Sequence, residues 1–216
     1  HNNMITINGQ KMGKSLGNFI TLEQLTTGAH PLLEQAYSPM TIRFFILQAQ
    51  YRSTLDFSNE ALQAAEKGYE RLMKAVSTLK KIKPSEASSV DISGVEARCT
   101  AAMDDDLNSP MVISELFDCV RTINQIYDGK QTISAVDLAE LRRVVDLFVF
   151  DILGLRDDLA GDNSQMLSSV VDMILNIRME AKNAKDWATS DKIRDGLAAI
   201  GIKVKDRKDG FDWEAE

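Results

Sequence analysis

The sequence predicts a mainly α-helical fold that ends in a small α/β unit. Apolar residues recur at three- and four-residue intervals over most of the chain, which is the period of an amphipathic helix. Short alternating apolar segments, typical of strands, are expected at residues 4–8 and 202–213. Hydrophobic residues make up 44% of the 216 residues, so the chain is long and apolar enough for one to three small domains with cores.

The first fifty residues are expected to contain a strand, a loop and two helices. Residues 4–8 (MITIN) suit a short strand, and Asn8-Gly9 is a typical hairpin turn. Residues 9–18 hold three glycines and few bulky side chains, which predicts a mobile loop. Residues 22–27 suit a short helix, and Pro39 suits the first turn of the next one.

A long helix is predicted from Ser58, its N-cap, to about Lys81. Residues 84–94 contain Ser and Pro and are expected to form a spacer. The apolar residues of the long helix fall on one face, which is therefore the predicted core face: Leu62, Ala65, Tyr69, Leu72, Val76 and Leu79.

Two more helices follow, each with a start signal. Asn108-Ser109-Pro110 combines a cap with a first-turn proline, and Ser134 with Asp137 resembles a capping box. Gly154 is expected to end the second helix. The aspartates at 104–106 are interpreted as charges at a helix start rather than as magnesium ligands, because adjacent carboxylates point in different directions. The predicted buried faces are Ile113, Leu116, Phe117, Val120, Ile123 and Tyr127 in the first helix and Leu138, Leu141, Val145, Phe148 and Ile152 in the second.

The last part of the chain predicts the α/β unit. Residues 157–163 are acidic and contain glycine, which suits a domain boundary. Helices are expected at about 165–182 and 187–200, and Gly201 ends the second one. Two short strands around a charged turn are then predicted from the alternating residues Ile202, Val204, Phe211 and Trp213.

The charges are unevenly distributed. The net charge is −7, which argues against a general nucleic-acid coat protein. Yet residues 178–208 contain nine Lys or Arg against five Asp or Glu, and residues 71–83 contain five cations and no acid. Local basic surfaces on an acidic protein suit an anionic partner that is bound at defined places.

The remaining composition excludes several classes of protein. Cys99 and Cys119 are expected to be buried, reduced thiols. No CxxC pair is present, and neither His1 nor His30 lies at metal-ligand spacing, so no metal site is predicted. No apolar run is long enough to span a membrane and no signal peptide is recognisable, so a cytoplasmic location is expected. Because the chain begins with His1 instead of Met, we expect it to derive from a longer protein.

The loop at Lys11-Met12-Gly13-Lys14-Ser15 has the composition of a phosphate-binding segment. Two lysines three residues apart on a glycine-containing loop can converge on one polyanion, and the Ser15 hydroxyl and backbone amides can add donors. The loop can equally be a solvated basic hairpin tip, and five residues alone do not decide between the two.

The surrounding sequence resembles one enzyme family from end to end. The segment NGQKMGKSLGNF (8–19) resembles the second signature motif of class I aminoacyl-tRNA synthetases, usually KMSKS followed by LGN. The segments AQYRSTLDFS (49–58), MDDDLNSP (103–110) and KDWATSDKIRDGLAAIGI (185–202), and then the terminal DGFDW, are similar to cysteinyl-tRNA synthetases in the same order. The chain is therefore identified as resembling the C-terminal part of that family.

The resemblance implies an activity and a division into parts. These enzymes convert cysteine and ATP to cysteinyl-adenylate and pyrophosphate, and then pass cysteine to the 3′-terminal ribose of cysteine tRNA. It implies a catalytic-domain end at 1–54 with the signature loop and a stem-contact region, a helical tRNA-binding bundle (DALR-like) at 55–160, and an anticodon-binding domain at 161–216. Cofactors implied are ATP with magnesium, and zinc only in a missing N-terminal part that also carries the HIGH motif. The isolated chain is then expected to be inactive, and a monomer.

The resemblance also assigns residues. In the loop it implies catalytic roles for Lys11 and Lys14, and ATP binding by these two with Met12 and Ser15. Gly13 stands where serine is usual, which removes a hydroxyl and loosens the loop. The tRNA anticodon-binding positions that it implies are Lys182, Trp187, Asp191, Arg194 and Asp206, and Lys182 stands where arginine is common.

The residues of the anticodon positions also suggest a direct physical role. Trp187, Asp191 and Arg194 are spaced to share a helix face that begins after the N-cap Asp186, and such a face suits unpaired bases. The alternative is that Trp187 caps the small core and that Asp191 only pairs with a neighbouring cation.

Other interpretations stay open at this stage. Arg43 and Arg52 can contact a tRNA stem or form structural ion pairs. For the whole chain, the alternatives are a fragment of the related cysteine ligase of mycothiol synthesis, which has no need of an anticodon domain, or a non-catalytic helical RNA-binding module, which leaves the Lys11–Ser15 loop unexplained.

Overall fold

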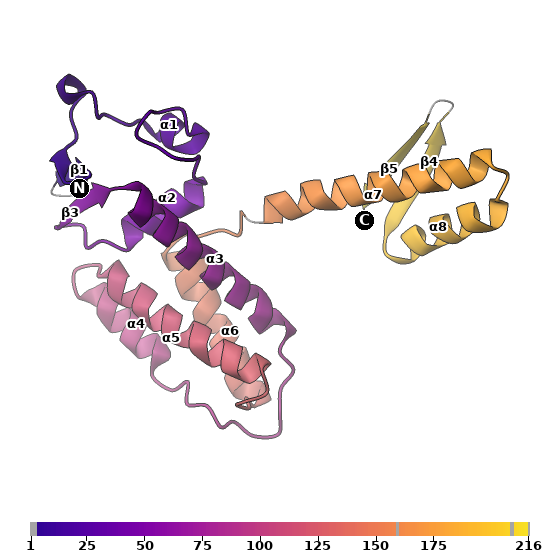
Figure 1. Ribbon diagram of the computed structural model, residues 1–216. Helices are drawn as coiled ribbons and strands as arrows, with labels where there is room; N and C mark the ends of the chain where they lie inside the picture. Colours follow the sequence, from indigo (N-terminus) through magenta and orange to yellow (C-terminus); the bar gives the residue numbers. More distant parts are fainter. Residues whose placement is uncertain (1–3, 159, 208–209, 216) are drawn as a thin grey trace. The chain divides into compact units, whose positions relative to one another are not determined.

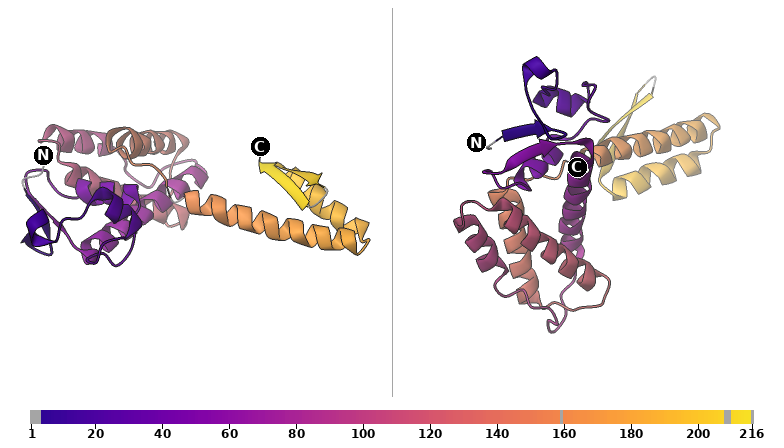
Figure 2. Two further views of the ribbon diagram at one scale, coloured as in Figure 1. Left: turned by 90° about the horizontal axis from the view of Figure 1, so that it is seen from above. Right: turned by 60° about the vertical axis from the view of Figure 1, so that its left-hand side comes forward.

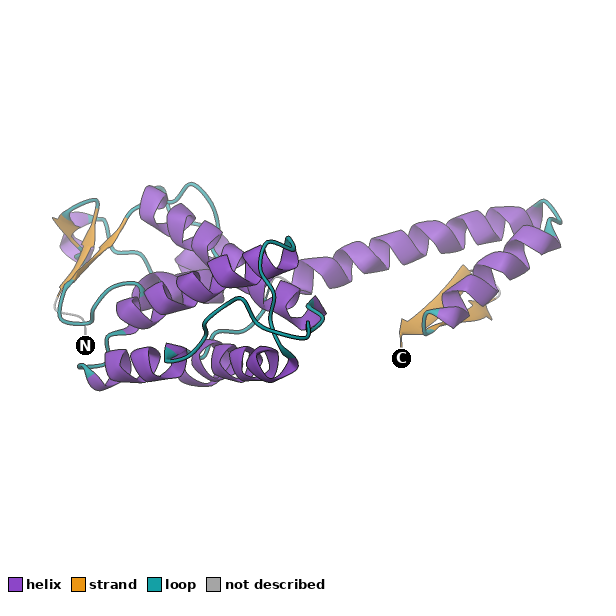
Figure 3. Ribbon diagram, turned by 90° about the horizontal axis from the view of Figure 1, so that it is seen from below, coloured by secondary structure: helices purple, strands orange, loops and turns teal. Residues whose placement is uncertain are grey.

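The computed structural model describes residues 4–158, 160–207 and 210–215 (Figure 1). The backbone divides into two units, His1–Asp158 and Leu159–Glu216. Helices dominate both units, and the described strands form one three-stranded and one two-stranded sheet (Figure 3). The prediction of a mainly α-helical fold is confirmed.

The first unit opens with a small sheet in the order β2-β1-β3. β1 (Met4–Ile7) pairs antiparallel with β2 (Gln10–Lys11) and parallel with β3 (Thr54–Phe57). The predicted turn is confirmed, because Asn8 and Gly9 between β1 and β2 both have positive φ, 49° and 77°. The sequence analysis missed β3, since its alternation covers four residues only and a helix follows at once.

Two helices connect β1 to β3. α1 (Leu22–Thr27) starts with a complete capping box formed by Thr21 and Gln24. α2 (Pro39–Leu47) has Ser38 as its N-cap and the predicted proline in its first turn. Phe44 of α2 is fully buried and its ring centroid lies 6.1 Å from that of Tyr69 in α3, so aromatic packing attaches this part to the helices that follow.

Four helices form a bundle: α3 (Asn59–Lys81), α4 (Val95–Asp104), α5 (Ser109–Tyr127) and α6 (Ala135–Asp146). In Figures 1 and 2, α3 runs from the sheet into the bundle. Ser58 caps α3 as predicted, accepting from the amide of Ala61 at 3.2 Å. All of its predicted core positions are buried: Leu62, Ala65, Tyr69, Leu72, Val76 and Leu79.

Both cysteines are buried free thiols in this bundle, as predicted. Cys99 lies in α4 and Cys119 in α5. Burial raises the pKa of Cys99 to about 11 and that of Cys119 to about 12, because the low-dielectric surroundings disfavour the thiolate.

Two predicted core residues are exposed instead. Tyr127 is 61% exposed because Ile126 fills the core position in the last turn of α5. Ile152 is 39% exposed because α6 continues into a π-helical segment, Leu147–Ile152. A π-turn adds a residue to the repeat, so Val149 and Leu153 take the buried positions.

The helix starts differ slightly from prediction. Ser134 caps α6 by accepting from the amide of Asp137 at 3.2 Å, but the reciprocal half of the capping box is absent. The amide of Ser134 donates to the hydroxyl of Ser88 instead, at 2.7 Å. The aspartates at 104–106 end α4 and lead into the turn before α5, so their interpretation as charges at a helix start was wrong.

The second unit is a helical hairpin followed by a strand hairpin. α7 (Ala160–Asn183) begins five residues before its predicted start, and α8 (Trp187–Ala199) packs on it. β4 (Ile202–Arg207) and β5 (Gly210–Ala215) pair antiparallel with Val204 opposite Trp213. The core residues come from both hairpins: Val171, Leu175, Leu197 and Ile202, with Phe211 and Trp213 packed against them.

Candidate functional sites

The lysine-containing loop is held to the sheet by an aspartate of β3. The Asp56 carboxylate accepts a hydrogen bond from the amide of Gly9 at 2.8 Å and from the hydroxyl of Thr6 at 2.5 Å. It therefore fixes the β1–β2 turn. The amide of Met12 donates to the carbonyl of Ile5 at 3.1 Å, so the hairpin pairing extends into the loop. Lys11 at the end of β2 thus leaves the sheet from a defined position.

Asn18 closes the loop from inside. The residue is only 7% exposed, and both ends of its side-chain amide are used. The Oδ1 atom accepts from the amide of Gly13 at 2.9 Å, and Nδ2 donates to the carbonyl of Lys11 at 3.1 Å. One side chain thereby fixes the backbone on either side of Met12. The sequence analysis quoted Asn18 in the motif but assigned it no role.

The cations of the loop point to solvent. Lys11, Lys14 and Ser15 are exposed, and Met12 is partly buried. Residues Lys14–Leu16 form one turn of 3-10 helix, and Nζ of Lys14 lies 5.4 Å from the ring centroid of Phe19. Among the described residues no carboxylate pairs with Lys11 or Lys14. Two unpaired cations on a pinned backbone are available to bind a polyanion.

Gly13 does not need to be glycine for its backbone conformation. Its φ of −162° and ψ of 141° are extended and open to any residue. A Cβ added at this position would meet the nearest atom, Cδ1 of Leu16, at 3.7 Å, an ordinary contact. A serine, as is usual in the motif, therefore fits here without rearrangement.

The second candidate site is the exposed face of α8. Asp186 is the N-cap, as predicted, and accepts from the amide of Thr189 at 3.1 Å. This hydrogen-bonding lowers the pKa of Asp186. Trp187 is 57% exposed, and Asp191 and Arg194 form an ion pair at 3.3 Å with side chains 60% and 51% exposed. An indole plane, a carboxylate and a guanidinium thus share one solvent-facing surface.

The two tryptophans of this unit have different positions. Trp213 of β5 packs against the core and donates from Nε1 to Oδ1 of Asp172 at 2.9 Å. Trp187 is outside that core. The alternative that Trp187 caps the core is therefore wrong, whereas the predicted pairing of Asp191 with a neighbouring cation is present. Arg194 also pairs with Asp195 at 3.2 Å.

Two anticodon candidates lie on other elements. Lys182 is in the last turn of α7 and is partly buried. Asp206 belongs to β4, and its side chain lies outside the described residues. The structure therefore brings Trp187, Asp191 and Arg194 together on α8.

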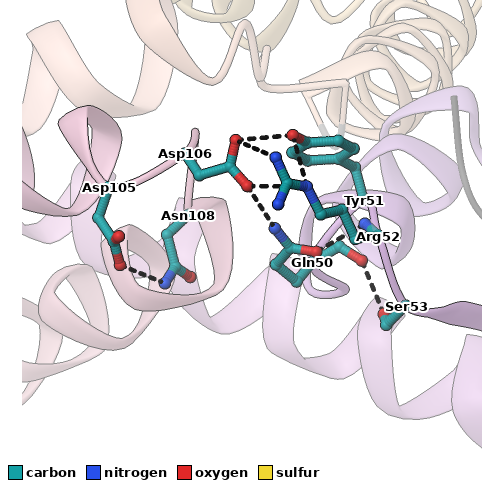
Figure 4. A network of polar contacts seen from close by, with 7 residues as sticks. All are labelled: Gln50, Tyr51, Arg52, Ser53, Asp105, Asp106 and Asn108. Atoms are coloured by element: carbon teal, nitrogen blue, oxygen red, sulfur yellow. Dashed lines mark hydrogen bonds and ion pairs between the residues drawn. The ribbon is translucent and has the colours of Figure 1, made fainter.

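The two arginines left open by the sequence have structural partners. Figure 4 shows the Asp106 carboxylate facing Gln50, Tyr51 and Arg52; the hydroxyl of Tyr51 donates to it at 2.6 Å, and Nε of Arg52 lies 3.1 Å away. Arg43 donates from Nε to the carbonyl of Leu153 at 2.8 Å. A Cβ at Gly154, whose φ is 62°, would lie only 2.6 Å from the Arg43 guanidinium.

No group of three or more His, Cys, Asp or Glu side chains arranged to hold a metal ion is found in the part of the chain that the structure describes. Within that same part, no helix is long and apolar enough to cross a membrane.

Three family models match successive parts of the chain. The model of the tRNA synthetases class I (C) catalytic domain matches residues 1–67, the DALR domain matches residues 98–156, and the cysteinyl-tRNA ligase anticodon-binding domain matches residues 164–213. The loop and the fold around it thus belong to the class I aminoacyl-tRNA synthetases.

Curated relatives narrow the assignment. The chain is 62% identical to a cysteine–tRNA ligase of Parabacteroides distasonis over 216 residues, and 59% identical to those of Porphyromonas gingivalis and Bacteroides fragilis. Each alignment covers 99% of this chain and 44% of the relative, so the chain spans less than half the length of the proteins it matches. The chain belongs to the cysteine–tRNA ligase family.

Proposed function

We propose that this chain supplies two working parts of a cysteine–tRNA ligase, an ATP-phosphate loop and an anticodon-reading surface. The observation that carries the proposal is the exposed Trp187–Asp191–Arg194 face of α8, in a unit whose core uses Trp213 instead. A large exposed aromatic beside hydrogen-bonding side chains has no packing function there, and it suits splayed bases.

The reaction of the whole enzyme proceeds in two steps. The carboxylate of cysteine attacks the α-phosphorus of ATP, forming cysteinyl-adenylate and releasing pyrophosphate. A hydroxyl of the 3′-terminal ribose of tRNA then attacks the adenylate carbonyl, which gives cysteinyl-tRNA and AMP. Magnesium accompanies ATP as its counterion.

Lys11 and Lys14 act on the first step. Negative charge shifts toward the β- and γ-phosphates as the bond from the α-phosphorus to pyrophosphate breaks, and two exposed ammonium groups on one loop stabilise that charge. One donor of this kind contributes about 3 kcal/mol to transition-state stabilisation. The Ser15 hydroxyl adds a hydrogen bond to the same anion, whereas the amides of Met12 and Gly13 already donate to the carbonyl of Ile5 and to Asn18. Asn18 holds Lys11 and Gly13 at fixed positions and is thus a positioning residue.

The α8 face acts on tRNA selection. Trp187 stacks on an unpaired base, which contributes about 1–3 kcal/mol per base. Asp191 accepts from base-edge donors, and Arg194, which its ion pair with Asp191 orients, donates to base edges or phosphate. Lys182 and Asp206 complete the set that the family resemblance assigns.

The cysteine pocket and the zinc ion belong, in this proposal, to the part of the relatives that the chain does not cover. The residues described here do not fit a zinc ion, since they offer no cluster of three candidate ligands. We therefore expect the chain alone to be inactive. Cysteine-dependent ATP–pyrophosphate exchange by residues 1–216 would contradict this expectation.

Two alternatives are less well supported. A ligase of mycothiol synthesis acts on an aminosugar and has no use for the anticodon-binding domain matched at 164–213. A non-catalytic RNA-binding module does not account for the similarity of residues 1–67 to a catalytic domain.

The decisive experiment measures tRNA binding by Asp191→Ala. The variant should bind cysteine tRNA about tenfold more weakly, because a base-edge acceptor is lost, and should bind a transcript with a changed anticodon almost as well as the unmodified chain does. Asp195→Ala is the matched control, since Asp195 is on the same helix and also pairs with Arg194. Equal losses on both transcripts would exclude direct reading by Asp191.

A further inference from the structure

One face of α3 carries a row of cations. Lys67, Arg71, Lys74 and Lys81 follow one another at intervals of four, three and seven residues, which places them on one side of a helix of 3.6 residues per turn. All four are exposed, and the core residues of α3 lie on the opposite side. We name these four residues the α3 stripe.

Among the described residues, the stripe lacks the carboxylate partners that several arginines of this unit have. Arg52, Arg98 and Arg143 form ion pairs with acidic side chains. Among the described residues no carboxylate pairs with any member of the stripe, and the Arg71 guanidinium lies instead 5.6 Å from the ring centroid of Phe117. Because the chain has a net charge of −7, a shortage of carboxylates does not explain this row.

The ordinary electrostatics of a helix explain only the cations at the C-terminal end of α3. Cations favour the C-terminal turn of a helix, which accounts for Lys80 and Lys81. That effect fades within one turn and does not reach Lys67, Arg71 or Lys74. Glu70 lies three residues after Lys67 and four before Lys74, spacings that allow side-chain pairing on a helix, yet no ion pair with either lysine is found among the described residues. Beyond Glu70, α3 contains no acid.

We propose that the α3 stripe binds the phosphate backbone of a double-stranded arm of tRNA. The proposal rests on the proposed function, which makes tRNA the anionic partner. From Lys67 to Lys81 the stripe is about 21 Å long, at 1.5 Å per residue, and so can follow several phosphates of one strand. Proteins recognise duplex RNA mainly through its shape and backbone, and a straight row of cations without base-reading side chains suits that task.

The experiment compares two triple variants of the 216-residue chain. In the stripe variant, Lys67→Ala, Lys74→Ala and Lys81→Ala remove three exposed charges while keeping good helix-forming residues and leaving the packed Arg71 in place. The control, Lys80→Ala, Lys83→Ala and Lys130→Ala, removes the same charge from exposed positions off the stripe. A Lys→Arg version of the stripe variant tests whether charge alone restores binding, and circular dichroism checks the fold of each.

The readout is Kd for cysteine tRNA against salt concentration. Loss of three phosphate contacts should raise Kd roughly tenfold near 0.1 M salt and lower the slope of log Kd against log salt by about 2 to 3. The loss should be equal for the transcript with a changed anticodon, and the Arg version should restore binding.

Three results would overturn the proposal. They are an unchanged salt slope in the stripe variant, an equal loss in the control, or a loss that depends on the anticodon. An unchanged slope together with anticodon-selective weakening by Asp191→Ala would reject the stripe and leave the proposed function standing. Absence of tRNA binding by the unmodified chain would reject both.

Discussion

The lysine loop and the α8 face both present functional side chains to solvent, but the two backbones are positioned by different means. The loop depends on contacts between distant parts of the chain, because Asp56 of β3 holds the turn at Gly9, and buried Asn18 fixes the backbone around Met12. The α8 face needs only helical periodicity and one N-cap, Asp186. The comparison indicates that tertiary hydrogen bonds fix the groups that must meet a reacting phosphate, whereas a helix alone suffices to present groups to bases.

The largest expected effect tests the chemical role of the loop. In a full-length ligase with this sequence, Lys14→Ala should lower kcat for cysteine-dependent ATP–pyrophosphate exchange about 10²- to 10³-fold, because a donor to the developing charge is lost. The Kd for tRNA should not change. A change confined to KM for ATP would show that Lys14 binds the ground state and transition state equally.

Substitution of the two tryptophans of the second unit distinguishes a residue that packs in the core, Trp213, from one proposed to recognise tRNA, Trp187. Trp213→Ala should destabilise the second unit by about 3 kcal/mol, because it removes a packed indole and its hydrogen bond to Asp172. Trp187→Ala, at a 57% exposed position, should change the free energy of unfolding by less than about 0.5 kcal/mol yet weaken tRNA binding by about 1–3 kcal/mol. Thermal unfolding and tRNA titration of both variants measure the contrast, and a stability loss at Trp187 would contradict it.

Asn18 tests whether the loop is fixed by its buried amide. Asn18→Ala should reduce kcat for pyrophosphate exchange about tenfold, because two backbone groups lose their partner at about 1 kcal/mol each. Asn18→Asp retains the acceptor for Gly13 but sets a carboxylate against the carbonyl of Lys11, so it should not restore the rate. Rates equal to those of the unmodified ligase would show that the loop is positioned by other contacts.

The smallest effect is expected at Gly13. Gly13→Ser fits the extended backbone and adds a hydroxyl, so it should alter stability by less than about 0.5 kcal/mol and should leave the exchange rate equal to or slightly above that of the unmodified ligase. A strong loss of activity would mean that the loop passes through a conformation that only glycine can adopt.

Much of the fold was predictable because its signals are local. Ser58, Asn108 and Asp186 cap their helices as predicted, and the periodicity of α3 identified its core face. The shared face of Trp187, Asp191 and Arg194 on α8 was predicted from the same helical periodicity. Local signals did not reveal the π-turn that exposes Ile152, since it depends on packing of the whole helix end.

The loop site was only half predictable. Its two lysines were identified by composition and resemblance, but the role of Asn18 depends on burial and on a chain reversal that residue spacing does not encode. Likewise, the partners of Arg43 and Arg52 are 110 and 54 residues away in sequence. Pairings over such separations arise only when the tertiary structure is formed.

The two buried cysteines make the chain convenient for spectroscopy. Cys99 and Cys119 are buried, and their raised pKa values, about 11 and about 12, leave almost no thiolate at neutral pH. Alkylating dyes react with thiolates, so the native protein should remain unlabelled. A single cysteine introduced at an exposed position of α3 or α8 would then carry the only probe, and its fluorescence would report tRNA arrival at that surface without removal of either natural thiol.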